Sequence, residues 1–125
     1  VTQKMVDDNL LLPNMTGQLV FKTAVVKFPE VIHEALQKEG LKTEDIDLLV
    51  PHQANLRISQ FVQRALRLPD EKVMNNIQKY GNTTAASIPI ALCEAWEQGR
   101  IKEGDLVCLA AFGSGFTWGS ALIRW

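Results

Sequence analysis

Residues 106–125 read LVCLAAFGSGFTWGSALIRW, and they outline the sheet that we expect at the centre of the protein. The run over 106–112 is apolar at every position, which is typical of a central strand buried on both faces. The glycine-rich stretch 113–115 then predicts a tight loop, and 118–125 predicts a last strand. This segment therefore predicts two strands joined by a short connection.

Upstream of these strands, the pattern alternates between helices and short strands. Apolar residues at three- and four-residue steps predict helices over 17–38, 55–68 and 84–98. Residues 46–50 are apolar and partly β-branched, as in a buried strand, and 72–77 predict a further short strand. The alternation predicts an α/β layered fold with a mixed sheet and packed helices.

Prolines and glycines mark where the helices should break or end. Pro29 should split the first helix in two, because it lacks an N–H and clashes with the preceding turn. Gly40 and Gly99 should terminate helices. In the helix over 84–98, we expect the apolar stripe, including Ala85 and Trp96, to be buried.

Length and composition limit the classes of protein to consider. The 125 residues suit one domain, and a net charge of −1 argues against a nucleic-acid binder. No apolar run approaches the roughly 20 residues of a membrane helix, and VTQKMVDDNL at the start lacks the features of a signal peptide. Residues 1–14 show no clear period, and we expect a loop or connection there.

Two cysteines, Cys93 and Cys108, do not make a disulfide framework and fit a reducing cytoplasm. Cys108 falls within a buried strand and Cys93 within a helix. Because buried thiols in apolar surroundings are inert, neither is our candidate nucleophile.

Two polar corners carry the strongest functional signal. VPHQANLR (50–57) and YGNTTAAS (80–87) place His52 and Asn82 where one element ends and a helix follows. In α/β proteins, side chains and free backbone N–H groups converge at such points. Taken singly, His52 could be a hydrogen-bonded structural residue, and Asn82 could be a turn or helix cap.

Two further features have a structural and a functional interpretation. The loop at 113–115 could be only a hairpin connection, or its backbone N–H groups could approach an oxyanion. The stripe of Arg57, Arg64 and Arg67 could be a solvated face, or it could meet phosphates or an acidic partner.

Four ordered motifs together resemble one family: MTGQLVFK (15–22), PHQANLRI (51–58), GNTTAASIPIAL (81–92) and AFGSGFTWGSALIRW (111–125). They are similar to the C-terminal half of β-ketoacyl-acyl carrier protein synthase III. The resemblance covers nearly the whole chain after residue 14. It implies the thiolase fold, in which two similar α/β halves enclose the active site.

The resemblance also implies a Cys-His-Asn triad, in which His52 and Asn82 match two members and the cysteine belongs to the absent N-terminal half. The implied reaction condenses acetyl-CoA with malonyl-acyl carrier protein and releases CoA and CO2. Both thioesters are substrates, and no cofactor or metal is implied. The family acts as a homodimer, and this chain should be inactive alone.

Binding residues follow from the same motifs. The channel for CoA and substrate is implied at Gly17, Phe21, Asn55, Phe112, Gly113, Ser114 and Gly115, with Ser114 standing where many members have glycine. Carrier-protein binding is implied at Gln53, Ala54, Asn55, Leu56, Arg57 and Arg64. Two alternatives remain: a related ketosynthase or acyltransferase of secondary metabolism, and a non-catalytic module that docks carrier protein or CoA.

Overall fold

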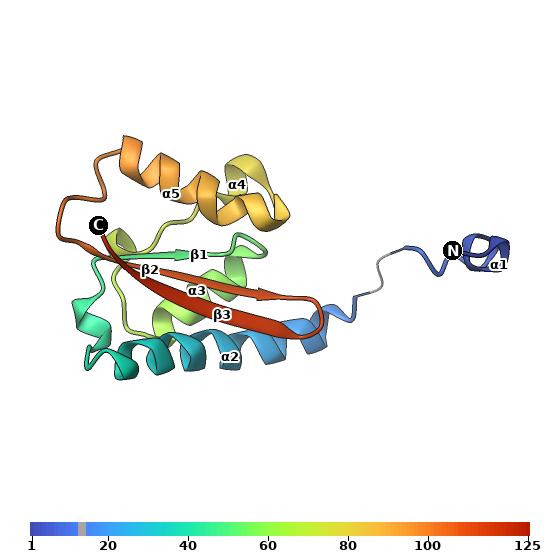
Figure 1. The fold of residues 1–125 in the computed structure, drawn as a ribbon, viewed down its shortest axis with the longest axis horizontal. Helices are drawn as coiled ribbons and strands as arrows, with labels where there is room; N and C mark the ends of the chain where they lie inside the picture. Colours follow the sequence, from blue (N-terminus) through green and yellow to red (C-terminus); the bar gives the residue numbers. More distant parts are fainter. Residues whose placement is uncertain (13–14) are drawn as a thin grey trace.

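The computed structural model describes residues 1–12 and 15–125, whose main body forms a layered α/β fold (Figure 1). Its helices and strands, in chain order, are α1 (Gln3–Asp7), α2 (Gly17–Lys38), β1 (Leu48–Pro51), α3 (Leu56–Ala65), α4 (Ile77–Tyr80), α5 (Ser87–Glu97), β2 (Leu106–Gly113) and β3 (Thr117–Arg124). Short 3-10 turns occur at η1 (Thr43–Asp45), η2 (Asp70–Lys72) and η3 (Thr84–Ala86).

The sheet is mixed, as predicted. Its order is β1-β2-β3, with β1 parallel to β2 and β2 antiparallel to β3. Leu109 at the middle of β2 pairs with Val50 on one side and with Ala121 on the other. The predicted final pair of strands is therefore an antiparallel hairpin, and β2 is the central strand.

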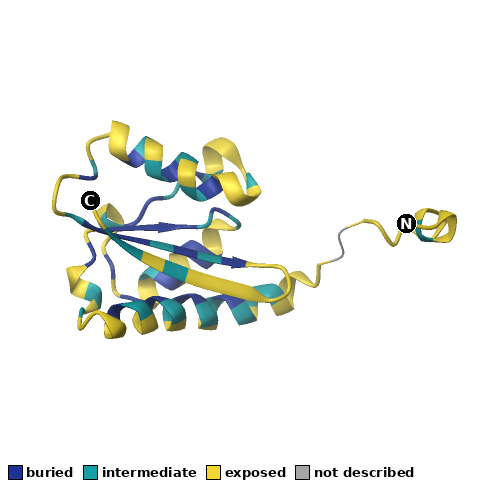
Figure 2. Cartoon of the chain, viewed as in Figure 1, coloured by how far each residue is buried: buried dark blue, intermediate teal, exposed yellow. Residues whose placement is uncertain are grey.

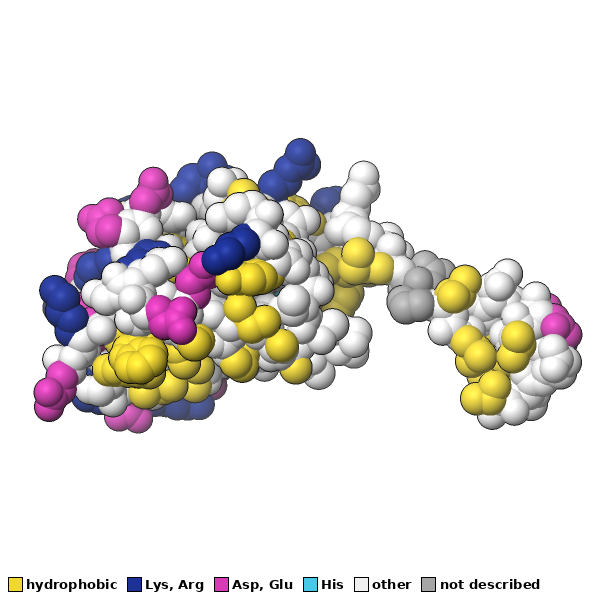
Figure 3. Space-filling model, turned by 90° about the horizontal axis from the view of Figure 1, so that it is seen from above, with side chains coloured by type: hydrophobic (Ala, Val, Ile, Leu, Met, Phe, Trp, Pro, Cys, Tyr) yellow, Lys and Arg dark blue, Asp and Glu magenta, His cyan; other side chains and the backbone are white. Residues whose placement is uncertain are grey.

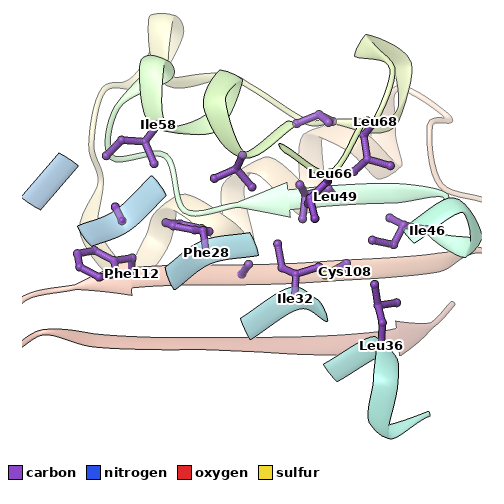
Figure 4. Packing of buried hydrophobic residues seen from close by; sticks show 14 of the residues in the cluster. Phe28, Ile32, Leu36, Ile46, Leu49, Ile58, Leu66, Leu68, Cys108 and Phe112 are labelled. Carbon is purple, nitrogen blue, oxygen red and sulfur yellow. The ribbon is translucent and has the colours of Figure 1, made fainter. Parts of the chain in front are cut away.

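Helices cover both faces of the sheet, which explains the uninterrupted apolar run of β2 (Figures 1 and 2). On one face, Leu49, Cys108 and Phe112 pack with residues of α2 and α3 (Figure 4). On the other, Val50 and Val107 pack with residues of α5. A strand covered on both sides has no polar face to present to water.

Helix α2 is continuous through Pro29, so the predicted break is wrong. Its buried residues recur every fourth position on both sides of the proline, at Ala24, Phe28, Ile32 and Leu36. Proline in a helix interior costs about 3 kcal/mol. Burying the last three of these side chains contributes about 2 kcal/mol each, which outweighs that cost.

The predicted glycine stops are confirmed at Gly40 and Gly99, where φ is +68° and +67°. After α2, the Leu41 N–H donates to the Leu36 carbonyl at 2.8 Å, and the Gly40 N–H donates to the Gln37 carbonyl at 3.2 Å. This pair of bonds is the Schellman motif, which needs a left-handed residue that glycine adopts without strain.

Two local predictions need correction. Residues 3–7 form the short helix α1 rather than loop, because the Thr2 hydroxyl accepts a hydrogen bond from the Met5 N–H and caps it. Residues 13–14 of that predicted connection lie outside the described residues. Between 72 and 77 the structure has a single bridge, Leu49 to Val73, instead of a strand.

The buried face of α5 is narrower than predicted. It consists of Ser87, Ala91 and Ala95, whereas Ala85 and Trp96 are exposed. Trp96 follows Ala95 and points about 100° around the helix from it. Ala85 lies in η3, before the helix begins. Across the described residues, no helix combines the length and apolar character that a bilayer crossing requires.

Candidate active site

The predicted site residues lie around one end of the layered body. The carboxyl ends of β1 and β2 and the amino ends of α2 and α5 all lie there (Figure 1). His52 directly follows β1, and its N–H donates to the Ala110 carbonyl of β2 at 2.8 Å. The loop at 113–115 follows β2 at the same edge, because the two strands are parallel.

The His52 side chain is half-buried and contacts the first residue of α5. Its Nδ1 lies 2.5 Å from the Ser87 Oγ, although the two residues are 35 positions apart. Burial lowers the pKa of His52, because the charged imidazolium loses solvation. The imidazole is therefore neutral at neutral pH.

Gln53 supports this corner from inside the protein. Its side-chain N–H groups donate to the carbonyls of Pro51 at 2.8 Å and Met74 at 3.1 Å. Its side-chain oxygen accepts from the N–H groups of Asn76 at 3.0 Å and Ile77 at 3.2 Å. Gln53 is only 3% exposed, and its side chain ties β1 to the segment leading into α4. Its place in the segment implied to bind carrier protein stays a prediction.

Asn82 forms a local turn before α5. Its side-chain oxygen accepts a hydrogen bond from the Thr84 N–H at 2.9 Å, and the residue is exposed. The structure therefore contains the turn that the sequence allowed for Asn82. Because this bond uses the oxygen, the NH2 of the same amide remains the donor that Asn82 can offer outward.

The loop at 113–115 is shaped by one glycine and one aromatic cluster. At Gly115, φ is +122°, and a Cβ would lie 3.2 Å from the Thr117 Cγ2, so the position suits glycine. The buried Phe112 ring stacks on Trp118 with ring centroids 6.3 Å apart and lies 5.4 Å from the Phe116 ring. These contacts fix the loop as a hairpin connection, which leaves its role toward an oxyanion a prediction.

The predicted carrier-protein residues other than Gln53 reach the surface before and along α3. Asn55 caps this helix, since its side-chain oxygen accepts from the Arg57 N–H at 2.9 Å. Arg57 and Arg64 are exposed and lie two turns apart on the same face. Leu56 is also exposed, and Ala54 is half-buried.

The remaining predicted channel residues belong to the first part of α2. Gly17 is its exposed first residue. One turn further, the half-buried Phe21 packs its ring edge-on against Phe61 of α3, with centroids 6.4 Å apart. Phe21 thus lies between α2 and α3.

Neither cysteine has the character of a nucleophile. Cys108 is fully buried, and burial raises the pKa of its thiol to about 12. Cys93 is exposed, and the negative charge of Glu97 raises the pKa of that thiol. Both environments disfavour the reactive thiolate.

Two structural supports of the site were missed in the sequence, Ser87 and the buried role of Gln53. Both depend on contacts between segments more than 20 residues apart. The local sequence indicated only that Ser87, a polar residue, lies on the buried side of α5. Helical periodicity alone does not show that Ser87 contacts His52. A groove of about 640 Å³ lies elsewhere, between α2 and β3, and is lined by residues such as Val31 and Leu122.

Comparison with known proteins supports the predicted resemblance. The family model described as 3-oxoacyl-[acyl-carrier-protein (ACP)] synthase III C terminal matches residues 36–125. The chain is 52% identical to beta-ketoacyl-[acyl-carrier-protein] synthase III of Clostridium perfringens, over 89% of the chain and 34% of that protein. It is 51% identical to the protein of the same name from Campylobacter jejuni, over 99% of the chain and 39% of that protein. The chain thus spans between a third and two fifths of the length of these relatives.

Solved structures show the same arrangement of elements. The crystal structure of 3-oxoacyl-[acyl-carrier-protein] synthase III from Aquifex aeolicus matches with a TM-score of 0.88 and 52% identity, over 90% of this chain and 36% of that one. Cerulenin-bound OleA of Xanthomonas campestris matches with a TM-score of 0.80 and 29% identity, over 86% of this chain and 33% of that one. The predicted fold, the C-terminal half of a thiolase-like fold, is confirmed.

Proposed function

Because the chain belongs to the family of 3-oxoacyl-[acyl-carrier-protein] synthase III C-terminal domains, we propose that it supplies two catalytic residues, His52 and Asn82, to a larger condensing acyltransferase. The observation that supports this most strongly is the pair of neutral donors at the amino end of α5. His52 contacts Ser87 at the start of that helix, and Asn82 forms the turn that leads into it.

The two donors suit the decarboxylation of a malonyl thioester. The bond between the malonyl carboxylate and the α-carbon breaks, CO2 leaves, and the electron pair moves onto the thioester oxygen as an enolate. The His52 imidazole and the Asn82 amide would each donate an N–H to that oxygen. Since burial lowers the pKa of His52, the donor at neutral pH is the N–H of a neutral imidazole rather than a buried cation.

The enolate carbon then attacks an acetyl group held as a thioester on a cysteine. The cysteine thiolate leaves, and acetoacetyl-acyl carrier protein forms. In the preceding step the same thiolate takes the acetyl group from acetyl-CoA and releases CoA, which separates acylation from condensation. This sequence is the first condensation of fatty acid synthesis, and we place it in the cytoplasm.

The nucleophile in this proposal comes from outside the chain. The pKa values of Cys93 and Cys108 are both raised, and the chain spans only 34% to 39% of its relatives' length. We therefore expect the cysteine on the remaining part of the full-length enzyme and no condensation by the chain alone.

The outer side of α4 and α5 supports the existence of a partner half. Figure 3 looks onto this side and shows hydrophobic side chains gathered in patches there. The exposed apolar residues of the segment are Tyr80, Ala85, Ala86, Pro89, Cys93 and Trp96. Exposed hydrophobic patches of this kind favour burial against another domain. The family homodimer would add a second interface.

Substrate binding is proposed at the surface around this site. Carrier protein would dock along the exposed face of α3, where the charges of Arg57 in its first turn and Arg64 in its last turn would attract an acidic partner. The pantetheine arm of either thioester would then pass toward His52, and its channel is proposed at Gly17, Phe21, Asn55, Phe112, Gly113, Ser114 and Gly115.

A condensation assay tests the proposal. The full-length enzyme, given acetyl-CoA and malonyl-acyl carrier protein, should form acetoacetyl-acyl carrier protein, and residues 1–125 alone should not. A full-length Cys93→Ser, Cys108→Ser variant should remain active, because neither cysteine is the proposed nucleophile. Condensation by the isolated chain, or its loss in the double cysteine variant, would contradict the assignment of the nucleophile.

The similarity to OleA at 29% identity favours a second candidate. The same domain could serve a related acyltransferase that condenses other acyl thioesters. Competition between acetyl-CoA and alternative acyl-CoA substrates, each with malonyl-acyl carrier protein as the second substrate, separates the two candidates, since the fatty acid enzyme should turn over the malonyl and acetyl pair fastest. A pure docking module would bind carrier protein and release no CO2.

A further inference from the structure

Ser87 occupies an unusual place for a serine at a helix start. It is 2% exposed and is the first residue of α5, after the N-cap residue Ala86. Its hydroxyl does not cap its own helix. Instead, the Oγ lies 2.5 Å from the His52 Nδ1 and 3.3 Å from the Gln53 backbone nitrogen.

These two contacts determine where the hydrogen atoms lie. The Gln53 N–H can only donate, so the Ser87 oxygen accepts from it. The hydroxyl hydrogen then needs an acceptor, because buried polar hydrogens are almost always paired. Among the described residues, the Nδ1 of His52 is the other polar atom bonded to this hydroxyl. Ser87 therefore donates to Nδ1.

A neutral imidazole carries one proton, and an Nδ1 that accepts a hydrogen bond leaves that proton on Nε2. Resting on the proposed function, we infer that Ser87 is a positioning residue that holds His52 in the Nε2–H tautomer, the form whose free nitrogen can donate to the enolate oxygen. The opposite tautomer would place an unprotonated Nε2, with its lone pair, against a developing negative charge.

Gln53 makes this arrangement rigid. Its side chain is fixed by bonds to Pro51, Met74, Asn76 and Ile77, so its backbone N–H stays directed at the Ser87 oxygen. That bond occupies one lone pair of the serine and orients the hydroxyl hydrogen toward Nδ1. The hydrogen bonds of Gln53 therefore hold His52 in place through the adjacent backbone and through Ser87 of α5.

The experiment reads the tautomer directly in the full-length enzyme labelled with 15N-histidine. Two-bond 1H–15N spectra at about pH 8, above the ordinary histidine pKa, distinguish the two neutral forms. The His52 signals are identified by their loss in His52→Ala. We expect wild-type His52 as the Nε2–H form. An Nδ1–H form in the wild type would overturn the inference, and this result does not depend on any variant folding.

Ser87→Ala should give a mixture of tautomers and lower kcat for malonyl decarboxylation about tenfold, with KM within about twofold. Ser87→Thr keeps the hydroxyl and should restore the Nε2–H form. The matched control is Ser59→Ala, which removes another buried hydroxyl, bonded to Asn75. It should change neither the tautomer nor kcat. A Ser87→Ala enzyme with wild-type spectrum and kcat would refute the role of Ser87.

Failure of the proposed function gives a different result. If His52→Ala retained full decarboxylation, the function assigned to His52 would be wrong, whatever tautomer the spectra showed. If His52→Ala lost decarboxylation while Ser87→Ala changed nothing, only the positioning role would fall.

Discussion

The corner at His52 is buried and cross-linked, whereas the corner at Asn82 is exposed and held by one local turn. His52 bonds to a residue 35 positions away, and its neighbour Gln53 makes four side-chain hydrogen bonds. Asn82 bonds only two positions ahead, to Thr84. His52 is therefore held in place by contacts with the core, whereas Asn82 is held by a turn within its own segment. The two should therefore respond differently to substitution.

The largest expected effect separates the two possible roles of Asn82. Asn82→Asp keeps an oxygen for the Thr84 N–H but removes the amide donor. We expect decarboxylation by the full-length enzyme to fall about 100- to 1000-fold, the effect of losing one oxyanion donor. The melting temperature should stay unchanged. Asn9→Asp adds the same charge at an exposed residue and serves as the control. Wild-type activity in Asn82→Asp would reduce Asn82 to a turn residue.

The next effect tests how far the His52 corner depends on the core. Gln53→Leu leaves the Asn76 and Ile77 N–H groups, and two carbonyls, without their partner. We expect a loss of about 3 kcal/mol in the free energy of unfolding, measured by chemical denaturation. Gln60→Leu, at an exposed position of α3, should change it by less than about 0.5 kcal/mol. Equal effects of the two substitutions would mean that the Gln53 network does not stabilise the fold.

The Gln53 network also marks the limit of what the sequence predicts. The apolar run of β2 and the glycines after α2 and α5 are local signals, and each predicted its element correctly. The continuity of α2 through Pro29 was not predictable, because it depends on packing against a distant sheet. The burial of Gln53 was missed for the same reason, since its partners at 74–77 are brought close only by the fold.

A smaller effect is expected at Arg57, whose side chain is exposed, whereas that of Gln53, four positions earlier, is buried. Arg57→Glu should raise KM for malonyl-acyl carrier protein about fivefold at low salt, and the difference should shrink as salt rises. The control Lys102→Glu makes the same charge change on an exposed turn away from α3. A KM that is unaffected by Arg57→Glu would exclude Arg57 from the docking surface.

The smallest effect concerns pH. Because burial lowers the pKa of His52, the imidazole should stay neutral as pH falls through the ordinary value of about 6.5. In that window the unfolded chain binds a proton that the folded chain does not, so stability is present in full above it and decreases as pH falls. The melting temperature of the wild type should therefore fall more between about pH 7 and 5 than that of His52→Gln. Parallel curves would show that the pKa of His52 is ordinary.

The sharpest test measures two steps side by side in the full-length enzyme that carries His52→Ala and Asn82→Ala together. One assay follows transfer of labelled acetyl from acetyl-CoA to the enzyme, and the other follows CO2 release from malonyl-acyl carrier protein. Since both residues serve as donors to the enolate and the nucleophile lies elsewhere, acylation should persist while CO2 release is lost. Loss of acylation with CO2 release intact would contradict the division of roles proposed for this chain.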